Sequence, residues 1–315
     1  MAENNISSIT GEPLMRSLNY RVILVEVFIA LFLCINSVLI TTFCMKDFFY
    51  TTMRYILFAT TLTSDCLILI ISNFLLLFDY FHLTMQIWLC LIMLILSSVY
   101  ILVTPVTLTA MTLERYVAIC MPLQHAELCS TRRALYCILI IHGLSSIPCI
   151  VILLISFLSA SHSFYKQYKV CSLEVFIFYS WQSHLKAAIN QLYFLIMSII
   201  IIFCYVKIMK VVKSASGANK KSSWKGLRTV GLHAFQLLLC LIQLWCPFIE
   251  TAVLQIDFML YINVRYFNYI TFYLAPRCLS PLIYGLRDEK FFLALKYYAL
   301  RGHYNSSHRG HKCEH

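Results

Sequence analysis

Residues 88–113 read WLCLIMLILSSVYILVTPVTLTAMTL, and this stretch is the strongest single indication of the fold. It belongs to a longer run, residues 80–113, that contains no Asp, Glu, Lys or Arg. A helix needs about 20 mostly apolar residues to cross the hydrocarbon core of a bilayer. The stretch is therefore long enough to span a membrane as a helix, and it is too long and too continuously apolar for a strand of a membrane barrel.

Six further apolar stretches lie on either side of it, and the core of each carries one charged residue or none. Charged residues make up 12% of the 315-residue chain, about half the share that is usual in soluble domains. We therefore predict an all-α membrane protein, a bundle of seven transmembrane helices. The predicted spans are residues 22–45, 55–78, 88–113, 134–158, 187–208, 229–251 and 264–286.

The distribution of Lys and Arg predicts the orientation of the bundle. With the N-terminus outside, the inner segments hold 18 of the 25 Lys and Arg residues and the outer segments hold 6. We therefore expect residues 1–21 to form an outer tail and residues 287–315 to lie inside, at the plasma membrane. Charges that alternate with aromatic residues at 288–300 predict a short amphipathic helix there. The net charge of +11 then fits a basic face against anionic lipid, not nucleic-acid binding.

Two of the 14 cysteines are placed differently from the rest. Most lie within predicted helices, where Cys acts as a small apolar residue. Cys90 lies at the outer end of the third span and Cys171 in the long outer loop before the fifth. Because only the outer side is oxidising, we predict a disulfide that holds this loop across the mouth of the bundle, although sequence alone does not prove the pairing. Asn5 begins a sequon in the outer tail and is a predicted glycosylation site.

The most informative motif ends the third span at the inner face. Residues 111–120 read MTLERYVAIC, with the triplet Glu114-Arg115-Tyr116, and residues 122–127 read PLQHAE. The triplet resembles that of rhodopsin-like receptors, and the flanking residues are similar to those of odorant (olfactory) receptors in particular. The alternative for the triplet alone is an ordinary ion pair at a helix end.

Companion motifs extend this resemblance over residues 20–300. Asp65 lies in the second span, and residues 244–247 of the sixth span read LWCP, ending at Pro247. Residues 279–287 read LSPLIYGLR and contain Pro281 and Tyr284. Cys90 precedes Arg115 by 25 residues, as in the family.

Three departures from the family pattern concern details. Ser280 replaces the usual Asn of the seventh span, and His142 stands where many relatives have Trp. The fifth span also lacks the common proline at its middle. These differences leave the predicted architecture unchanged.

The resemblance implies a receptor that detects a small-molecule odorant and activates a heterotrimeric G protein, of the stimulatory type that raises cyclic AMP. Arg115 would lock the inactive state, with Glu114 as its counter-ion, and would then meet the G protein. No enzymatic activity, cofactor or metal is expected. The residues expected to take part in coupling and switching are Glu114, Arg115, Tyr116, Tyr205, Pro247, Pro281, Tyr284, Asp65 and Arg277.

Arg277 is an unusual residue because a cation within a span is costly in lipid and should face a partner in the interior. Asp65 is the obvious acid, and in many rhodopsin-like receptors the equivalent acid binds sodium. We therefore predict that Arg277 pairs with Asp65 and replaces that ion. A pair that only fixes helix packing is an equally good interpretation.

The residues of the ligand pocket are predicted by counting along each helix from the motifs that match the family. A shift of one residue turns a side chain by about 100°, and plain helix packing is the alternative at each position. Because Ser97 stands where amine receptors have a carboxylate, we expect a small, neutral or weakly polar ligand. The predicted pocket residues are Ser97, Ser98, Ile101, Leu102, Asn190, Tyr193, Trp245, Phe248, Ala252, Ile270 and Tyr273.

Three other functions fit the sequence less well. A rhodopsin-like receptor for a peptide or lipid lacks support from the flanking residues of the motifs. A transporter or channel would use Asp65 and Arg277 as an ion relay, but the sequence shows no paired halves with broken helices. An intramembrane enzyme lacks metal-ligand spacing, since His142 and His233 are isolated.

Overall fold

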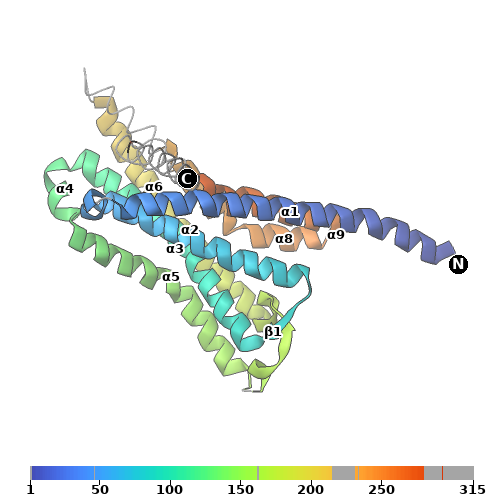
Figure 1. The fold of residues 1–315 in the computed structure, drawn as a ribbon. Coiled ribbons are helices and arrows are strands. Elements are labelled where there is room, and N and C mark those ends of the chain that lie inside the picture. The colour runs from blue at the N-terminus through green and yellow to red at the C-terminus, as the bar shows by residue number, and fades with distance from the viewer. Residues whose placement is uncertain are drawn as a thin grey trace, which may run out of the picture.

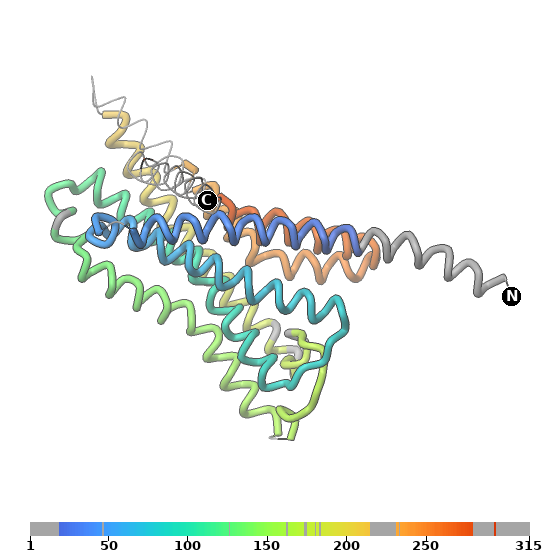
Figure 2. The backbone as a smooth tube through the Cα atoms, viewed as in Figure 1, coloured from blue at the N-terminus to red at the C-terminus, as the bar shows by residue number. Residues whose placement is uncertain are grey.

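The computed structural model describes residues 2–45, 47–161, 163–214, 231–232, 234–279 and 293, and only the backbone at residues 2–18, 126, 173, 174, 180 and 183 (Figure 2). Long helices dominate these residues. α3 lies at the centre of the bundle because it packs against α2, α5 and α6 (Figure 1). The five long helices are α1 (Ala2–Cys44), α2 (Met53–Tyr80), α3 (Ile87–Cys120), α5 (Thr131–Ser159) and α6 (Ser180–Ser214).

Short elements close the two ends of the bundle. At one end lie the 3-10 helix η1 (Asp47–Thr51) and the helix α4 (Pro122–Leu128). At the other end, β1 (Thr84–Gln86) pairs antiparallel with β2 (Tyr168–Val170) (Figure 1). Two 3-10 helices flank β2, η2 (Phe164–Lys166) and η3 (Leu173–Phe176). The loop that contains β2 therefore reaches back to the start of α3.

The sixth and seventh helices are interrupted. The sixth consists of a helical segment, Ala234–Gln243, and α8 (Cys246–Leu254), which meet at an angle of 41°. The seventh begins with α9 (Phe258–Asn268), continues as the π-helix η4 (Tyr269–Leu274), and is α-helical again at residues 275–279. Among the described residues, five helices are long and apolar enough to cross a membrane, or six if the bent pair forms one span.

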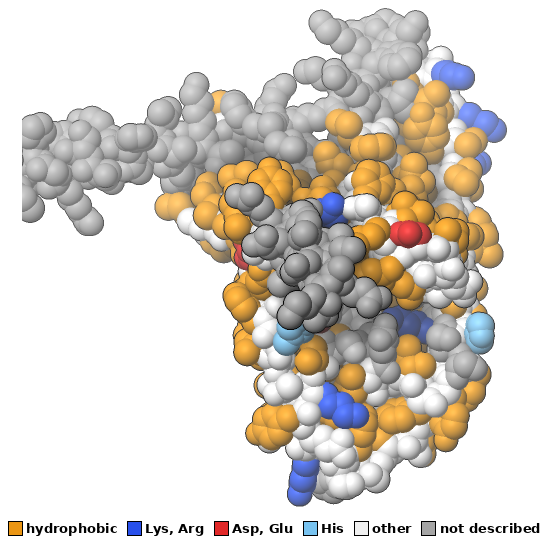
Figure 3. Space-filling view, turned by 90° about the vertical axis from the view of Figure 1, so that its right-hand side faces the viewer, with side chains coloured by type: hydrophobic (Ala, Val, Ile, Leu, Met, Phe, Trp, Pro, Cys, Tyr) orange, Lys and Arg blue, Asp and Glu red, His pale blue; other side chains and the backbone are white. Residues whose placement is uncertain are grey.

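The outer surface of the helices is apolar. Leu139, Leu154 and Ile202 are each more than half exposed, and hydrophobic side chains cover much of the face in Figure 3. In water such a surface would favour aggregation, whereas in a bilayer it contacts lipid. The interior contains buried hydroxyls, for example those of Thr61 and Thr107, which donate to carbonyls one turn earlier at 3.1 and 2.7 Å. These two hydroxyls are thus satisfied within their own helices, without water.

The helices extend beyond the predicted spans. α3 continues past residue 113 to Cys120 and so includes the charged triplet, because charged side chains at a helix end reach the aqueous interface. α9 starts at Phe258, before the predicted residue 264, because the carboxylate of Asp257 caps it by accepting the Leu260 N–H at 2.7 Å. The amphipathic helix predicted after residue 286 lies outside the described residues.

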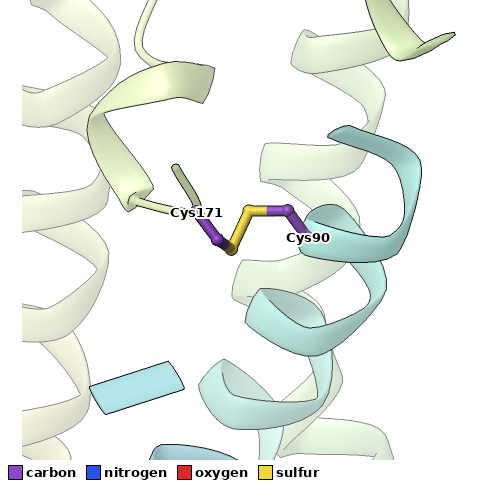
Figure 4. Close-up of a disulfide and its surroundings, with 2 residues drawn as sticks. All are labelled: Cys90 and Cys171. Atoms are coloured by element: carbon purple, nitrogen blue, oxygen red, sulfur yellow. A yellow bond between two sulfur atoms is a disulfide. The ribbon is translucent and has the colours of Figure 1, made fainter. Parts of the chain in front are cut away.

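The predicted disulfide is confirmed. Cys90 and Cys171 are joined by a bond whose Cα atoms lie 5.4 Å apart, across 81 residues of sequence. Figure 4 shows the loop at Cys171 held against the first turns of α3. The same end of the bundle carries the β1–β2 pair. Because disulfides persist in oxidising compartments, this end agrees with the outer face predicted from Lys and Arg.

Candidate ligand and signalling sites

The inner end of α3 carries a shared carboxylate. Glu114 is 7% exposed, and one of its oxygens lies 3.8 Å from Nε of Arg115. Its other oxygen lies 3.2 Å from Nε2 of His125, which belongs to α4. The predicted counter-ion role of Glu114 thus involves two partners. His125 lies within the quoted motif, but nothing in the sequence indicated that α4 folds back toward Glu114.

Not all hydrogen-bond donors of Arg115 have a partner at this end of the bundle. Its Nε and Nη2 atoms are buried and have no hydrogen-bond partner among the described residues, so the contact with Glu114 is an ion pair without a hydrogen bond. The ring of Tyr116 lies 5.7 Å from that of Phe203 on α6. Tyr205, also on α6, is 37% exposed. The inner ends of α3 and α6 are therefore packed together, with donors on Arg115 still available.

At mid-bundle, Asp65 and Arg277 lie together as the sequence suggested. Both side chains are fully buried, and Nε of Arg277 is 3.8 Å from Oδ1 of Asp65. Thr104 donates to the same Asp65 oxygen at 2.8 Å, and Arg277 donates from Nη1 to Gln243 at 2.9 Å. The guanidinium also lies 5.0 Å from the ring of Tyr273. This cluster joins α2, α3 and the sixth and seventh helices.

The predicted bend of the sixth helix is present just before Pro247. The Leu244 and Trp245 N–H groups donate to carbonyls only three residues earlier, at 3.1 and 2.8 Å. Proline has no N–H and its ring crowds the preceding turn, so the helix tightens and changes direction by 41°. Beyond the bend, Glu250 accepts a hydrogen bond from Asn268 at 3.0 Å, which ties α8 to the seventh helix.

A sequence profile described as "7 transmembrane receptor (rhodopsin family)" matches residues 35–284. The chain belongs to this family. Odorant receptor 131-2 of Danio rerio is 42% identical to the receptor over 304 residues, which are 96% of this chain and 93% of that relative. The predicted resemblance and the seven-helix fold are thereby confirmed, and the receptor is a multi-pass protein of the plasma membrane. Its family is one of receptors, not of enzymes.

The residues predicted to bind ligand fall into separate packing groups in the receptor. Ile101, Ile270 and Tyr273 pack in one apolar cluster. Leu102 is buried in the central cluster, against which Tyr193 packs. The remaining residues differ in exposure: Trp245 and Phe248 are exposed rings 6.3 Å apart, Ala252 is exposed, and Ser97, Ser98 and Asn190 are half-buried. Pro281, Tyr284 and the side chain of Asn5 lie outside the described residues.

A small cavity lies between the outer halves of α5 and α6, beneath the outer loop. Its volume is about 40 Å³, and seven of its ten lining side chains are apolar. The other three are Ser156, Gln182 and Lys186. None of the eleven predicted pocket residues lines it. Lys186 precedes the predicted fifth span, residues 187–208, and is therefore expected in the outer loop, whereas the structure places it within α6.

Proposed function

We propose that the receptor detects small-molecule odorants and activates a heterotrimeric G protein, of the type that raises cyclic AMP. The observation that carries the proposal is Arg115, a cation at the inner end of α3 with two buried N–H groups that have no hydrogen-bond partner among the described residues. Such donors suit the carbonyl end of a helix from a partner protein. The name of the zebrafish relative supports an odorant as the stimulus.

The mechanism follows from two arrangements of one bundle. An odorant that binds the active arrangement more tightly shifts the population toward it. The bend before Pro247 divides the sixth helix into an outer part, α8, and an inner part that packs in the same apolar cluster as Leu108 and Met111 of α3. Movement of the inner part would open a cleft beside Arg115 and Tyr205, where a G-protein helix docks. Lys207, Lys210 and Lys213, on the inner part of α6, add positive charge beside this cleft.

The test measures odorant-driven cyclic AMP in cells that express the receptor or its Arg115→Ala variant. We expect the response of the variant to fall at least roughly tenfold at equal surface expression, since a charged hydrogen bond contributes about 1.5–3 kcal/mol. Arg133→Ala is the matched control, because Arg133 is an inner-face arginine in an exposed ion pair with Glu127. An Arg115→Ala variant that responds like the parent would contradict the proposal.

A further inference from the structure

The cavity between α5 and α6 contains hydrogen-bond donors without acceptors. Ser156 is 1% exposed, and its hydroxyl has no partner among the described residues. Nε2 of Gln182 is likewise buried and without a partner in the described part of the chain. The amide oxygen of Gln182 accepts the backbone N–H groups of Phe178 and Tyr179 at 2.7 and 3.3 Å, so the amide nitrogen is the free end.

The wall around Ser156 is fixed by the outer loop. The hydroxyl of Tyr165 donates to the carbonyl of Ser156 at 2.9 Å, and burial raises the pKa of Tyr165, so this donor keeps its proton at neutral pH. The Ser156 carbonyl also accepts the N–H of Ala160 at 3.0 Å. The carbonyl is therefore already occupied, and the Ser156 hydroxyl remains available to a ligand in the cavity.

Lys186 adds a cation to the same cavity. It lines the space together with Ser156 and Gln182, and it has no carboxylate within ion-pair distance among the described side chains. A partly buried ammonium and two unpaired donors are unfavourable in an apolar wall unless an acceptor is supplied. A single negatively charged hydrogen-bond acceptor would therefore satisfy all three groups.

We propose that this cavity binds the carboxylate of a small ligand with a short apolar tail. A carboxylate only accepts hydrogen bonds, with about four lone pairs, whereas Ser156, Gln182 and Lys186 offer donors. Hydrogen bonds to an ionised group are about twice as strong as neutral ones. The seven apolar side chains suit a short tail, and a volume of about 40 Å³ limits the cavity to a small ligand.

This inference rests on the proposed odorant function and narrows its chemistry. Lys186 and Asn190 lie four residues apart on α6 and therefore on one face of the helix, so the cavity lies about one turn from one of the residues predicted to bind the ligand. Ser97 stands where amine receptors have a carboxylate. The lack of a negative charge there argues against an amine ligand but does not exclude an anionic one. The expectation of a neutral ligand thus becomes one of a short carboxylic acid in its ionised form.

The experiment measures the thermal unfolding of the purified receptor with butanoate, with the matched neutral butanamide, and with inorganic phosphate. Butanoate should raise the unfolding midpoint, because a ligand that binds only the folded state stabilises it. We expect butanamide and phosphate to have little effect. Lys186→Gln should weaken butanoate binding at least roughly tenfold, and Ser156→Ala by a few-fold. Lys166→Gln, the same change on the exposed outer loop, should leave binding unchanged.

Lys186→Arg keeps the cation and should retain the preference for butanoate, which separates loss of charge from misfolding. Equal stabilisation of the Lys186→Gln variant and the parent would overturn the proposal. Stabilisation by butanamide as large as that by butanoate would also overturn it, as would stabilisation by phosphate alone. No G protein is present in this assay, so a failure of binding is distinguishable from a failure of Arg115 to signal.

Discussion

Asp65 and Arg277 form a fully buried ion pair at the centre of the receptor. Removing both charges from water is costly, and the attraction between them compensates only where further hydrogen bonds satisfy the remaining donors and acceptors. Thr104 on α3 and Gln243 on the sixth helix supply such bonds. The pair therefore joins four helices, and the loss of either partner leaves one charge uncompensated.

Arg277→Gln tests whether the guanidinium occupies the place of a cation. We expect a loss of about 3–5 kcal/mol of stability, because Asp65 is left buried without its counter-ion. Sodium should then stabilise the variant and raise its activation threshold, while the parent is insensitive to sodium. Thermal unfolding and cyclic AMP dose–response curves in sodium and in choline chloride measure both effects.

The control for Arg277→Gln is the double variant Asp65→Asn/Arg277→Gln, which removes both charges of the pair. It should regain most of the lost stability and should not respond to sodium. Equal sodium sensitivity and equal activation thresholds in the parent and Arg277→Gln would leave the pair as a packing feature only.

Lys186 shows why part of the site could not be predicted. In the sequence it lies just before a long apolar run, which predicts a position in the outer loop. The structure places it one or two turns inside α6, opposite Ser156 on α5. A donor cluster made by two helices has no sequence signature, because its members, Ser156, Gln182 and Lys186, are separated by 26 and 4 residues of unremarkable sequence. Asp65 and Arg277 were easier to pair, since charges are rare in spans.

At the level of elements, the two interrupted helices are adjacent in sequence. The sixth bends before Pro247, and the seventh contains a π-helix at Tyr269–Leu274. Pro247 predicts the bend from the sequence, whereas no residue in the π-helix predicts its wider turn. π-helical turns often occur at functional sites. The hydrogen bond from Asn268 to Glu250 connects the two helices between these irregular points and the outer end.

Pro247→Ala tests the bend of the sixth helix. Alanine restores an N–H that can bond one turn earlier and removes the ring that crowds the preceding turn, so we expect a straighter and more stable helix, by up to about 3 kcal/mol. Odorant-driven cyclic AMP should fall several-fold at equal surface expression, while ligand-induced thermal stabilisation persists. Unchanged signalling by the variant would show that the receptor switches without this bend.

The span interiors were predictable for a reason that does not extend to the helix ends. A run of about 20 residues without charge is a strong constraint in lipid. The ends depend on caps and interfacial charges, and helices continue into water wherever hydrogen bonds allow it. Asp257 caps α9 ahead of the predicted span, and α3 carries Glu114 and Arg115 in its last turns. These details are local and vary from helix to helix.

The whole molecule is organised by lipid on its sides and by charge at its ends. Apolar side chains face outward along the helices, while Lys and Arg are concentrated in the segments predicted to lie inside. The disulfide end and the Arg115 end are opposite ends of α3. The proposed ligand and signalling sites are therefore separated by about the length of one helix.

Antibody labelling of terminal tags tests the orientation of the whole chain. We expect an N-terminal tag to be stained on intact cells and a C-terminal tag only after the membrane is permeabilised, with at least a roughly tenfold difference in signal. A cytosolic protein stained in parallel verifies that intact cells exclude the antibody. Staining of the C-terminal tag on intact cells would invert the proposed positions of the ligand and signalling sites.

The bond between Cys90 and Cys171 also constrains how the receptor is made. The helices can assemble as soon as they are inserted, but the loop that roofs the cavity is fastened only after its thiols meet an oxidant. We therefore expect two stages of biosynthesis: assembly of the helices, and then closure of the outer loop. A preparation from a reducing cell-free lysate would stop after the first stage, and its ability to bind ligand would depend on a later oxidation step.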